Sequence, residues 1–208
     1  MNNNLEKDLK DCLAIIGSDW KMQSNYMDKR TNFIYRCKTL ASCLENIRLT
    51  GVDKHYALHR WYNYMTSIAC EYLFCDYGAI HDKDVYNHDV DIYINGVPFD
   101  VKVTVYPAKL SNRPYNLKTR DGKNQMIRWY YANQSQQARK QMLNRLYVVC
   151  DGKDSYECLV MKSDFTILRE KIKAFMDYSL LNGVNTIQIS DNGITYNLQS
   201  DIVYISYN

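Results

Sequence analysis

Four residues that could carry out chemistry lie close together between residues 88 and 102. Asp89, Asp91 and Asp100 supply carboxylates, and Lys102 supplies an ammonium group. Carboxylate oxygens are hard ligands of the kind that Mg²⁺ binds. A metal ion beside a fixed cation can stabilise the charge that develops on a reacting phosphoryl group. The residue types therefore predict a divalent metal site suited to attack on a phosphodiester.

The elements that must position these residues are two short strands that meet at Asn95-Gly96. Asn-Gly favours a two-residue type I′ turn, because both central residues need positive φ. Such a turn pairs Asp91 with Asp100 and Asp89 with Lys102, and directly opposed residues share one face of a hairpin. The other face is apolar and should pack on a core; it carries Val90, Ile92, Ile94, Val97, Phe99 and Val101.

Asp91 and Asp100 would repel each other in this register, because opposed Cβ atoms lie about 5 Å apart. A shared cation removes that repulsion. The stretch Asp100-Val101-Lys102, with an acid ahead of it, resembles the (D/E)-x-K motif of the PD-(D/E)xK superfamily of restriction-endonuclease-like nucleases. The resemblance covers residues 56–150. The upstream acid of the family corresponds to Asp91 or Asp89, and we favour Asp91 because it opposes Asp100. The histidine at position 88 stands where the family often has proline.

Many members of this family add a glutamate from the preceding helix, and Glu71 is placed to supply it. A helix is predicted there because apolar residues recur at three- and four-residue spacing; they are Leu58, Trp61, Met65, Ile68 and Tyr72. Glu71 falls at the edge of that stripe. The alternative is a glutamate on a solvated helix flank.

The resemblance implies an α/β fold with a restriction-endonuclease-like core, a mixed central sheet flanked by helices. It also implies a metal-dependent nuclease that hydrolyses DNA phosphodiester bonds, either restriction-type or structure-guided, with Mg²⁺ as cofactor and Mn²⁺ as a substitute. The catalytic residues implied are Asp91, Asp100, Lys102 and Glu71. The metal ligands implied are Asp91, Asp100, the carbonyl of Val101, and Asp89. The competing interpretation is a non-catalytic nucleic-acid-binding protein that retains a nuclease-like fold.

The stretch from Lys102 to Arg145 is strongly basic. It holds ten basic residues and a single acidic one, Asp121, and so carries +9, whereas the whole chain carries +3. Such asymmetry is typical of a surface that meets a polyanion. We expect DNA contacts from the basic residues inside this stretch, namely Lys109, Arg113, Lys118, Arg120, Lys123 and Arg128. Aromatic residues 129–131 could stack on bases or pack in the core.

Periodicity and turn residues predict the remaining elements. Residues 4–50 should be mainly helical, with breaks at Gly17-Ser18 and Thr50-Gly51. Loop signals predict a flexible insertion over residues 107–125. The other expected elements are a helix over 133–144, strands at 146–150 and 156–161, a helix over 164–181, and strands at 186–190, 194–198 and 203–206.

The chain as a whole is expected to form a single domain over residues 1–208. It divides into a helical N-terminal region (1–50), a nuclease-like core (56–150) and a strand-helix-strand extension (151–208). The C-terminal strands could extend the sheet or form the contact of a homodimer.

Composition excludes several classes of protein. Hydrophobic residues make up 46% and mean hydropathy is −0.46, so a soluble globular chain is expected, with no run long enough to span a membrane. Seven scattered cysteines without a C-x-x-C motif suggest reduced thiols in a cytoplasm. His55 and His59 could share a helical face, but no third zinc ligand has suitable spacing.

Overall fold

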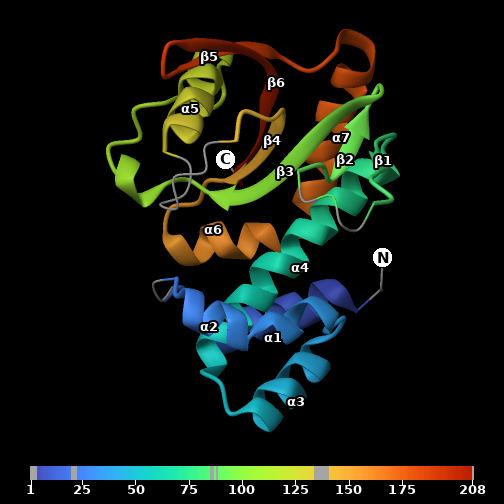
Figure 1. Ribbon diagram of the computed structural model, residues 1–208, viewed down its shortest axis with the longest axis vertical. Coiled ribbons are helices and arrows are strands. Elements are labelled where there is room, and N and C mark those ends of the chain that lie inside the picture. The colour runs from blue at the N-terminus through green and yellow to red at the C-terminus, as the bar shows by residue number, and fades with distance from the viewer. Residues whose placement is uncertain (1–3, 20–22, 85–86, 88, 134–140, 208) are drawn as a thin grey trace.

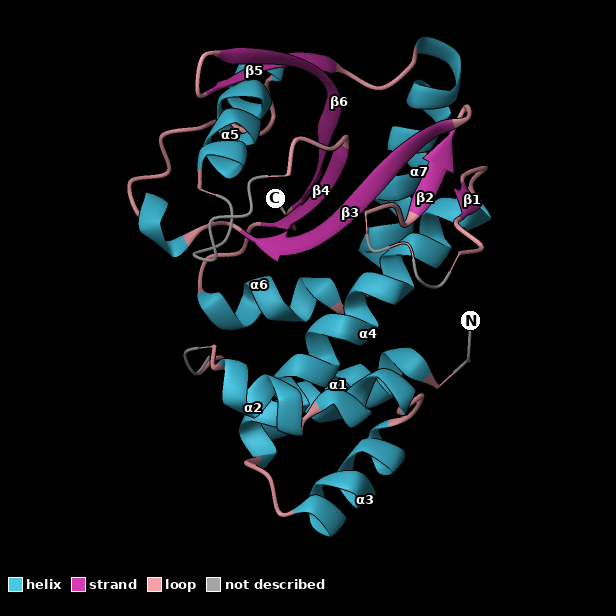
Figure 2. Cartoon of the chain, in the orientation of Figure 1, coloured by secondary structure: helices cyan, strands magenta, loops and turns pink. Residues whose placement is uncertain are grey.

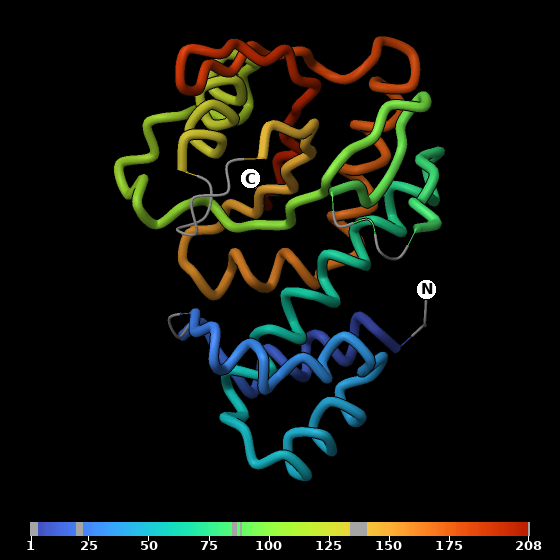
Figure 3. The backbone as a smooth tube through the Cα atoms, in the orientation of Figure 1, coloured from blue at the N-terminus to red at the C-terminus, as the bar shows by residue number. Residues whose placement is uncertain are grey.

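The central feature of the computed structural model is an open, mixed sheet of six strands in the order β1-β2-β3-β4-β6-β5, with helices on both of its faces (Figure 1). The structure describes residues 4–19, 23–84, 87, 89–133 and 141–207. Figure 3 shows that the N-terminal helices gather at the end of the molecule opposite the β5–β6 hairpin. The α/β class, the mixed sheet and the helical N-terminal region match the expectation from the sequence.

The N-terminal region consists of α1 (Leu5–Ile16), α2 (Asn25–Arg30), a 3₁₀ turn η1 (Asn32–Arg36) and α3 (Leu40–Thr50). The buried residues of α1 recur at helical spacing and form its inner face: Leu5, Leu9, Cys12, Leu13 and Ile16. Gly17 and Gly51 have φ of 61° and 62° and end α1 and α3, so both predicted breaks are confirmed.

Helix α4 (Lys54–Asp76) joins this region to the sheet (Figure 2). It contacts α1 and α3 on one side and β3 and α7 on the other. Trp61 and Met65 are buried as predicted, but Tyr72 is exposed, and Leu73 and Phe74 take its place in the core. The buried face of α4 therefore passes through Leu73 and Phe74 and not through Tyr72, because the end of the helix packs on the sheet and α7 and not on the N-terminal helices.

The strands are β1 (Ile80–His81), β2 (Ile92–Ile94), β3 (Val97–Val105), β4 (Arg145–Cys150), β5 (Thr186–Asp191) and β6 (Ile194–Ile205). β1 pairs with β2 and β2 with β3, both antiparallel. β3, β4 and β6 run parallel to one another, and β5 returns antiparallel along β6. All six residues of β4 are buried, as the predicted strand at 146–150 requires.

The connection from β3 to β4 differs from the prediction. A short 3₁₀ turn η2 (Ala108–Leu110) is followed by α5 (Arg120–Ala132), so the helix begins inside the stretch predicted as a loop. The Thr119 hydroxyl accepts a hydrogen bond from the Gly122 N–H and caps the helix. Asp121-Gly122 is therefore a first helical turn and not a loop signal. Gly122 is needed there because a Cβ would lie 2.0 Å from the Asn116 carbonyl oxygen.

The helix predicted over residues 133–144 is wrong where it can be checked, because α5 ends at Ala132 and residues 141–144 are not helical. The rest of that prediction, residues 134–140, lies outside the described residues.

The C-terminal part also differs from the predicted strand-helix-strand extension. Residues 156–161, predicted as a strand, belong to α6 (Ser155–Lys162), because the Asp154 carboxylate accepts from the Glu157 N–H and starts a helix. The predicted helix over 164–181 is confirmed as α7 (Phe165–Asn182). The strands predicted at 194–198 and 203–206 are one strand, β6, which lies beside β4 inside the sheet.

Two clusters of buried side chains hold these layers together. The larger lies between one face of the sheet and helices α1, α3, α4, α6 and α7, and the smaller lies under α5 on the other face. All seven cysteines are free thiols. Among the described residues, we find no helix whose length and hydropathy would let it cross a membrane.

Candidate active site

The hairpin β2–β3 has the predicted turn. Asn95 and Gly96 have φ of 51° and 78°, which are the two positive values that a type I′ turn needs. Ile92 pairs with Phe99 and Ile94 with Val97, as the sequence predicts. The apolar face of the hairpin packs in the larger core, where Ile92, Ile94, Phe99 and Val101 are buried.

The strand pairing stops one residue before the acids, and this corrects the prediction. A continued ladder would give the Val101 N–H to the Val90 carbonyl. Instead, the Val101 N–H donates to Asp91 Oδ2 at 2.7 Å, and the Asp91 N–H donates to the Phe99 carbonyl at 2.9 Å. The predicted pairs Asp91–Asp100 and Asp89–Lys102 are therefore not rungs of a ladder.

Asp91 nevertheless lies close to Asp100. Burial raises the pKa of Asp91, and the negative charge of Asp100 raises it further, while the hydrogen bond from Val101 opposes both effects. Side-chain placement therefore brings these two carboxylates together where backbone pairing does not.

Asp100 is buried between two cations. Lys102 Nζ contacts one of its oxygens, and Arg145 Nε donates to the other at 2.8 Å. The side chains of Asp100 and Arg145 are 4% and 7% exposed, whereas that of Lys102 is 49% exposed. The Arg145 guanidinium also lies over the Tyr131 ring, 5.7 Å from its centroid. Lys102 is therefore the cation of this group that solvent, or a ligand, can reach.

Sequence reasoning missed Arg145 as a site residue and counted it only as part of the basic stretch. Arg145 begins β4 and stands directly beside Asp100 in the parallel register. The available signal was an arginine at the head of an otherwise apolar strand, since a buried guanidinium needs a partner.

Glu71 reaches the same place from α4, and the alternative of a solvated flank is wrong because its side chain is 7% exposed. Its Oε2 lies 3.0 Å from Nε2 of His81, the last residue of β1. Burial and the charge of Asp91 raise the pKa of Glu71 to about 7, against lowering effects of His81 and Lys102. The structure thus brings Glu71, Asp91, Asp100 and Lys102 together.

His81 is a second residue that sequence reasoning missed. Its ring stacks on Tyr72, with centroids 5.4 Å apart and planes at 16°, and its Nδ1 lies 2.8 Å from the Asp82 carbonyl oxygen. A carbonyl oxygen only accepts, so Nδ1 carries a proton and Nε2 is the atom that faces Glu71. The available signal was a histidine placed between the predicted helix that carries Glu71 and the predicted hairpin.

Asp89 contacts Gln141, whereas Lys102, its predicted partner, pairs with Asp100. Asp89 is exposed, and its Oδ1 accepts from Gln141 Nε2 at 3.0 Å. Gln141 Oε1 in turn accepts from Arg145 at 3.3 Å, so Asp89 connects to Asp100 only through two further side chains. This geometry favours Asp91 over Asp89 as the upstream acid.

Two carboxylates of the cluster fit a divalent cation. Within the part of the chain that the structure describes, no three His, Cys, Asp or Glu side chains are arranged to hold an ion together. Asp100 has both oxygens engaged by cations. Glu71 and Asp91, however, are buried carboxylates whose pKa values are raised partly by neighbouring negative charge, and a cation would relieve that repulsion. These two donors therefore fit Mg²⁺, and the Val101 carbonyl remains a predicted ligand.

Comparison with known proteins gives no family for this chain. No family model, no curated protein and no solved structure matches it. The geometry of the site is therefore the evidence that bears on the function.

Several cations of the basic stretch are paired with acids from other elements. Arg113 forms an ion pair with Asp151 and donates to the Gly152 carbonyl. Arg120 pairs with Asp201 at 2.7 Å, and Lys123 is half-buried. Part of the +9 charge therefore stabilises the fold, because carboxylates of the C-terminal region neutralise it.

Lys109, Lys118 and Arg128 are exposed and remain the strongest predicted DNA contacts of this stretch. The aromatic residues beside them belong to the core: Tyr131 is fully buried, and Tyr130 stacks on Tyr147 with centroids 4.5 Å apart. His55 is exposed, whereas His59 is buried in α4.

Proposed function

We propose that this chain is a divalent-metal-dependent nuclease that hydrolyses phosphodiester bonds of DNA. The observation that carries the proposal is the convergence of Glu71 from α4 with Asp91, Asp100 and Lys102 from the β2–β3 hairpin. Two buried carboxylates that can take a metal ion, beside an accessible ammonium group that Asp100 orients, suit an ion and a phosphate.

The order of elements supports the finer fold assignment. The series α4-β1-β2-β3-α5-β4 reproduces the α-β-β-β-α-β order of the restriction-endonuclease-like core, with β3 parallel to β4. A resemblance to the PD-(D/E)xK superfamily therefore remains our preferred interpretation. The seven free thiols suit a reducing compartment, and we propose the cytoplasm. Homodimer formation stays a prediction.

In the proposed reaction Glu71 and Asp91 would hold Mg²⁺, which would supply an activated water and polarisation of the phosphoryl group. Lys102 contributes a half-exposed ammonium group that can contact a phosphate oxygen and offset developing negative charge. Asp100 orients Lys102, and Arg145 fixes Asp100 from the opposite side. Glu71 and Asp91 would hold the ion as carboxylates, and the ion would offset the mutual repulsion that helps to raise the pKa of Glu71.

The test is cleavage of plasmid, linear, nicked and branched DNA with Mg²⁺ by purified wild type and three variants. Asp91→Asn and Lys102→Met should each lower the cleavage rate by about 100-fold or more, while DNA affinity stays near the wild-type value. Asp11→Asn, which removes an exposed carboxylate of α1, is the control and should cleave normally. Metal-dependent cleavage at the wild-type rate by Asp91→Asn would overturn the assignment.

The second candidate is a non-catalytic nucleic-acid-binding protein with the same fold. The observation in its favour is that Lys102 and Arg145 already neutralise Asp100, which leaves two carboxylates for an ion. A protein of this kind would bind DNA but would gain no stability from Mg²⁺ and would cut none of the DNA substrates.

A further inference from the structure

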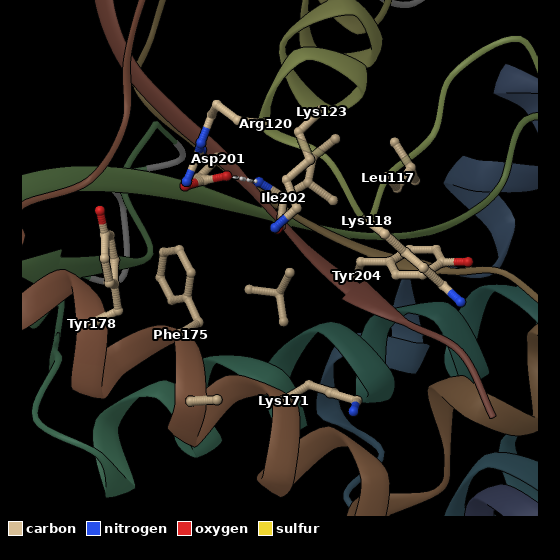
Figure 4. A pocket seen from close by; sticks show the side chains of 12 residues that line it. Leu117, Lys118, Arg120, Lys123, Lys171, Phe175, Tyr178, Asp201, Ile202 and Tyr204 are labelled. Carbon is tan, nitrogen blue, oxygen red and sulfur yellow. Dashed lines mark hydrogen bonds and ion pairs between the residues drawn. The ribbon is translucent and has the colours of Figure 1, made fainter. Parts of the chain in front are cut away.

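A basic pocket of about 370 Å³ lies at the outer edge of β6, separate from the carboxylate cluster. The segment before α5, the start of α5, the end of β6 and one side of α7 surround it (Figure 4). Four cationic side chains and one carboxylate line it: Lys118, Arg120, Lys123, Lys171 and Asp201. This volume is within the range of small-ligand sites.

The edge of β6 is open here because β5 pairs with β6 only as far as Gln199. Beyond that point β6 has β4 on one side, and no strand of the described residues on the other. Side chains satisfy the exposed backbone: Lys123 donates to the Ile202 carbonyl at 2.7 Å, and the Ile202 N–H donates to Asp201. A strand from a partner could not pair with Ile202 while these bonds last, so the side chains must recognise the ligand.

The charge of the pocket favours an anion. Arg120 neutralises Asp201, which leaves three ammonium groups. Lys123 uses one of its three donors on Ile202. Lys171 contacts Glu170 at 2.8 Å, but both side chains are solvent-accessible and such a pair is weak. Lys118 is exposed and forms no ion pair with any carboxylate of the described chain.

Aromatic rings line the same pocket as these cations. Phe175 and Tyr178 follow Lys171 along α7, and Figure 4 shows both rings directed toward the pocket. Tyr178 is 57% exposed, so a face of its ring is open to a planar ligand. A ring that can stack and ammonium groups that can bind phosphate line the same pocket, and they match the bases and the phosphates of a single strand.

We propose that this pocket binds a short single-stranded DNA segment, with its phosphates at Lys118 and Lys171 and one of its bases against Tyr178. A duplex keeps its bases stacked and offers no free base face, whereas an unpaired nucleotide can enter a concave pocket. The inference deepens the proposed function, on which it rests for the identity of the polymer. On this inference, the substrate of the proposed nuclease is a DNA with a single-stranded extension or branch.

The test measures DNA binding by fluorescence anisotropy in EDTA, so that cleavage plays no part. The probes are a blunt duplex, the same duplex with a single-stranded extension, and the single strand alone. The variants are Lys118→Gln/Lys171→Gln and Tyr178→Leu. The control is Lys153→Gln/Lys173→Gln, which removes the same charge from exposed lysines outside the pocket, one of them on α7.

Wild type should bind the extended duplex about tenfold more tightly than the blunt one, and each pocket variant should lose most of that gain. The double lysine variant should also reduce the slope of log affinity against log salt on the single strand by about 1.4, for two lost phosphate contacts. The control should retain the preference for the extension.

Equal losses on blunt and extended duplex would overturn the proposal. So would competition by inorganic phosphate or a free mononucleotide as effective as that by the single strand, because the pocket would then be a small-anion site. Failure of the nuclease assignment looks different: Mg²⁺-dependent cleavage would be absent while the preference for the extension in EDTA persists.

Discussion

Asp100 and Arg145 stand side by side on the parallel strands β3 and β4, and their buried side chains form an ion pair with Nε 2.8 Å from Oδ2. The pair lies next to Lys102, the accessible cation of the candidate site. It therefore links the central sheet to the residues for which we propose chemistry.

Removing Arg145 should strongly destabilise the protein, because it leaves the buried Asp100 carboxylate with Lys102 alone. Arg145→Met should lower the free energy of unfolding by about 3–5 kcal/mol in urea denaturation. Arg48→Met, which breaks an exposed pair with Glu45, should leave the midpoint nearly unchanged. A similar small effect for both variants would show that the buried pair contributes little.

Glu71 should give the stability a pH dependence of defined sign. Its pKa is about 7 in the folded protein against an ordinary value of 4.5, so the folded state keeps a proton that the unfolded chain releases. The free energy of unfolding should therefore fall by about 3 kcal/mol as pH rises from 4.5 to 7, and stay level above.

Glu71→Gln removes this ionisation and should flatten that part of the profile. The measurement is urea unfolding of both proteins near pH 5 and near pH 8. The free energy of unfolding of the variant minus that of wild type should be larger near pH 8 than near pH 5. Parallel profiles for the two proteins would contradict the raised pKa of Glu71.

Mg²⁺ should stabilise the wild-type protein, because a cation relieves the repulsion between Glu71 and Asp91. A free ion concentration about 100 times the Kd corresponds to about 2.7 kcal/mol. Thermal unfolding with and without Mg²⁺ measures the effect, and it should be largely lost in Asp91→Asn. Asp11→Asn serves as the control, and an unchanged Mg²⁺ effect in Asp91→Asn would place the ion elsewhere.

The turn at Gly96 should matter for activity as well as stability. Gly96 and Gly193 have φ of +78° and +79°, and a Cβ at either position would meet nothing within 4 Å. Alanine at either should cost about 1 kcal/mol through backbone strain alone. Only Gly96→Ala should also slow DNA cleavage, since only that turn belongs to the hairpin that carries the site. Equal cleavage rates in the two variants would show that the turn at Gly96 does not affect the candidate site.

Local sequence patterns were sufficient for much of the fold. Asn95-Gly96 determined the hairpin turn, because few residue pairs adopt two positive φ values at low cost. The apolar periodicity of α1 and the continuous apolar run of β4 likewise determined a helix and a buried strand. Asp121-Gly122 misled, because a glycine required for close packing against Asn116 has the same appearance as a loop glycine.

The sequence by itself determined the hairpin that carries the carboxylates and the lysine. Turn preference and the alternation of side chains along a strand depend on only a few neighbouring residues. The tertiary structure decided which groups meet them. Arg145 and Glu71 come from distant segments, and only the packing of β4 and α4 brings them to Asp100 and Asp91. Long-range pairing of this kind leaves no periodic trace, because burial and charge neutralisation depend on elements that are far apart in the chain.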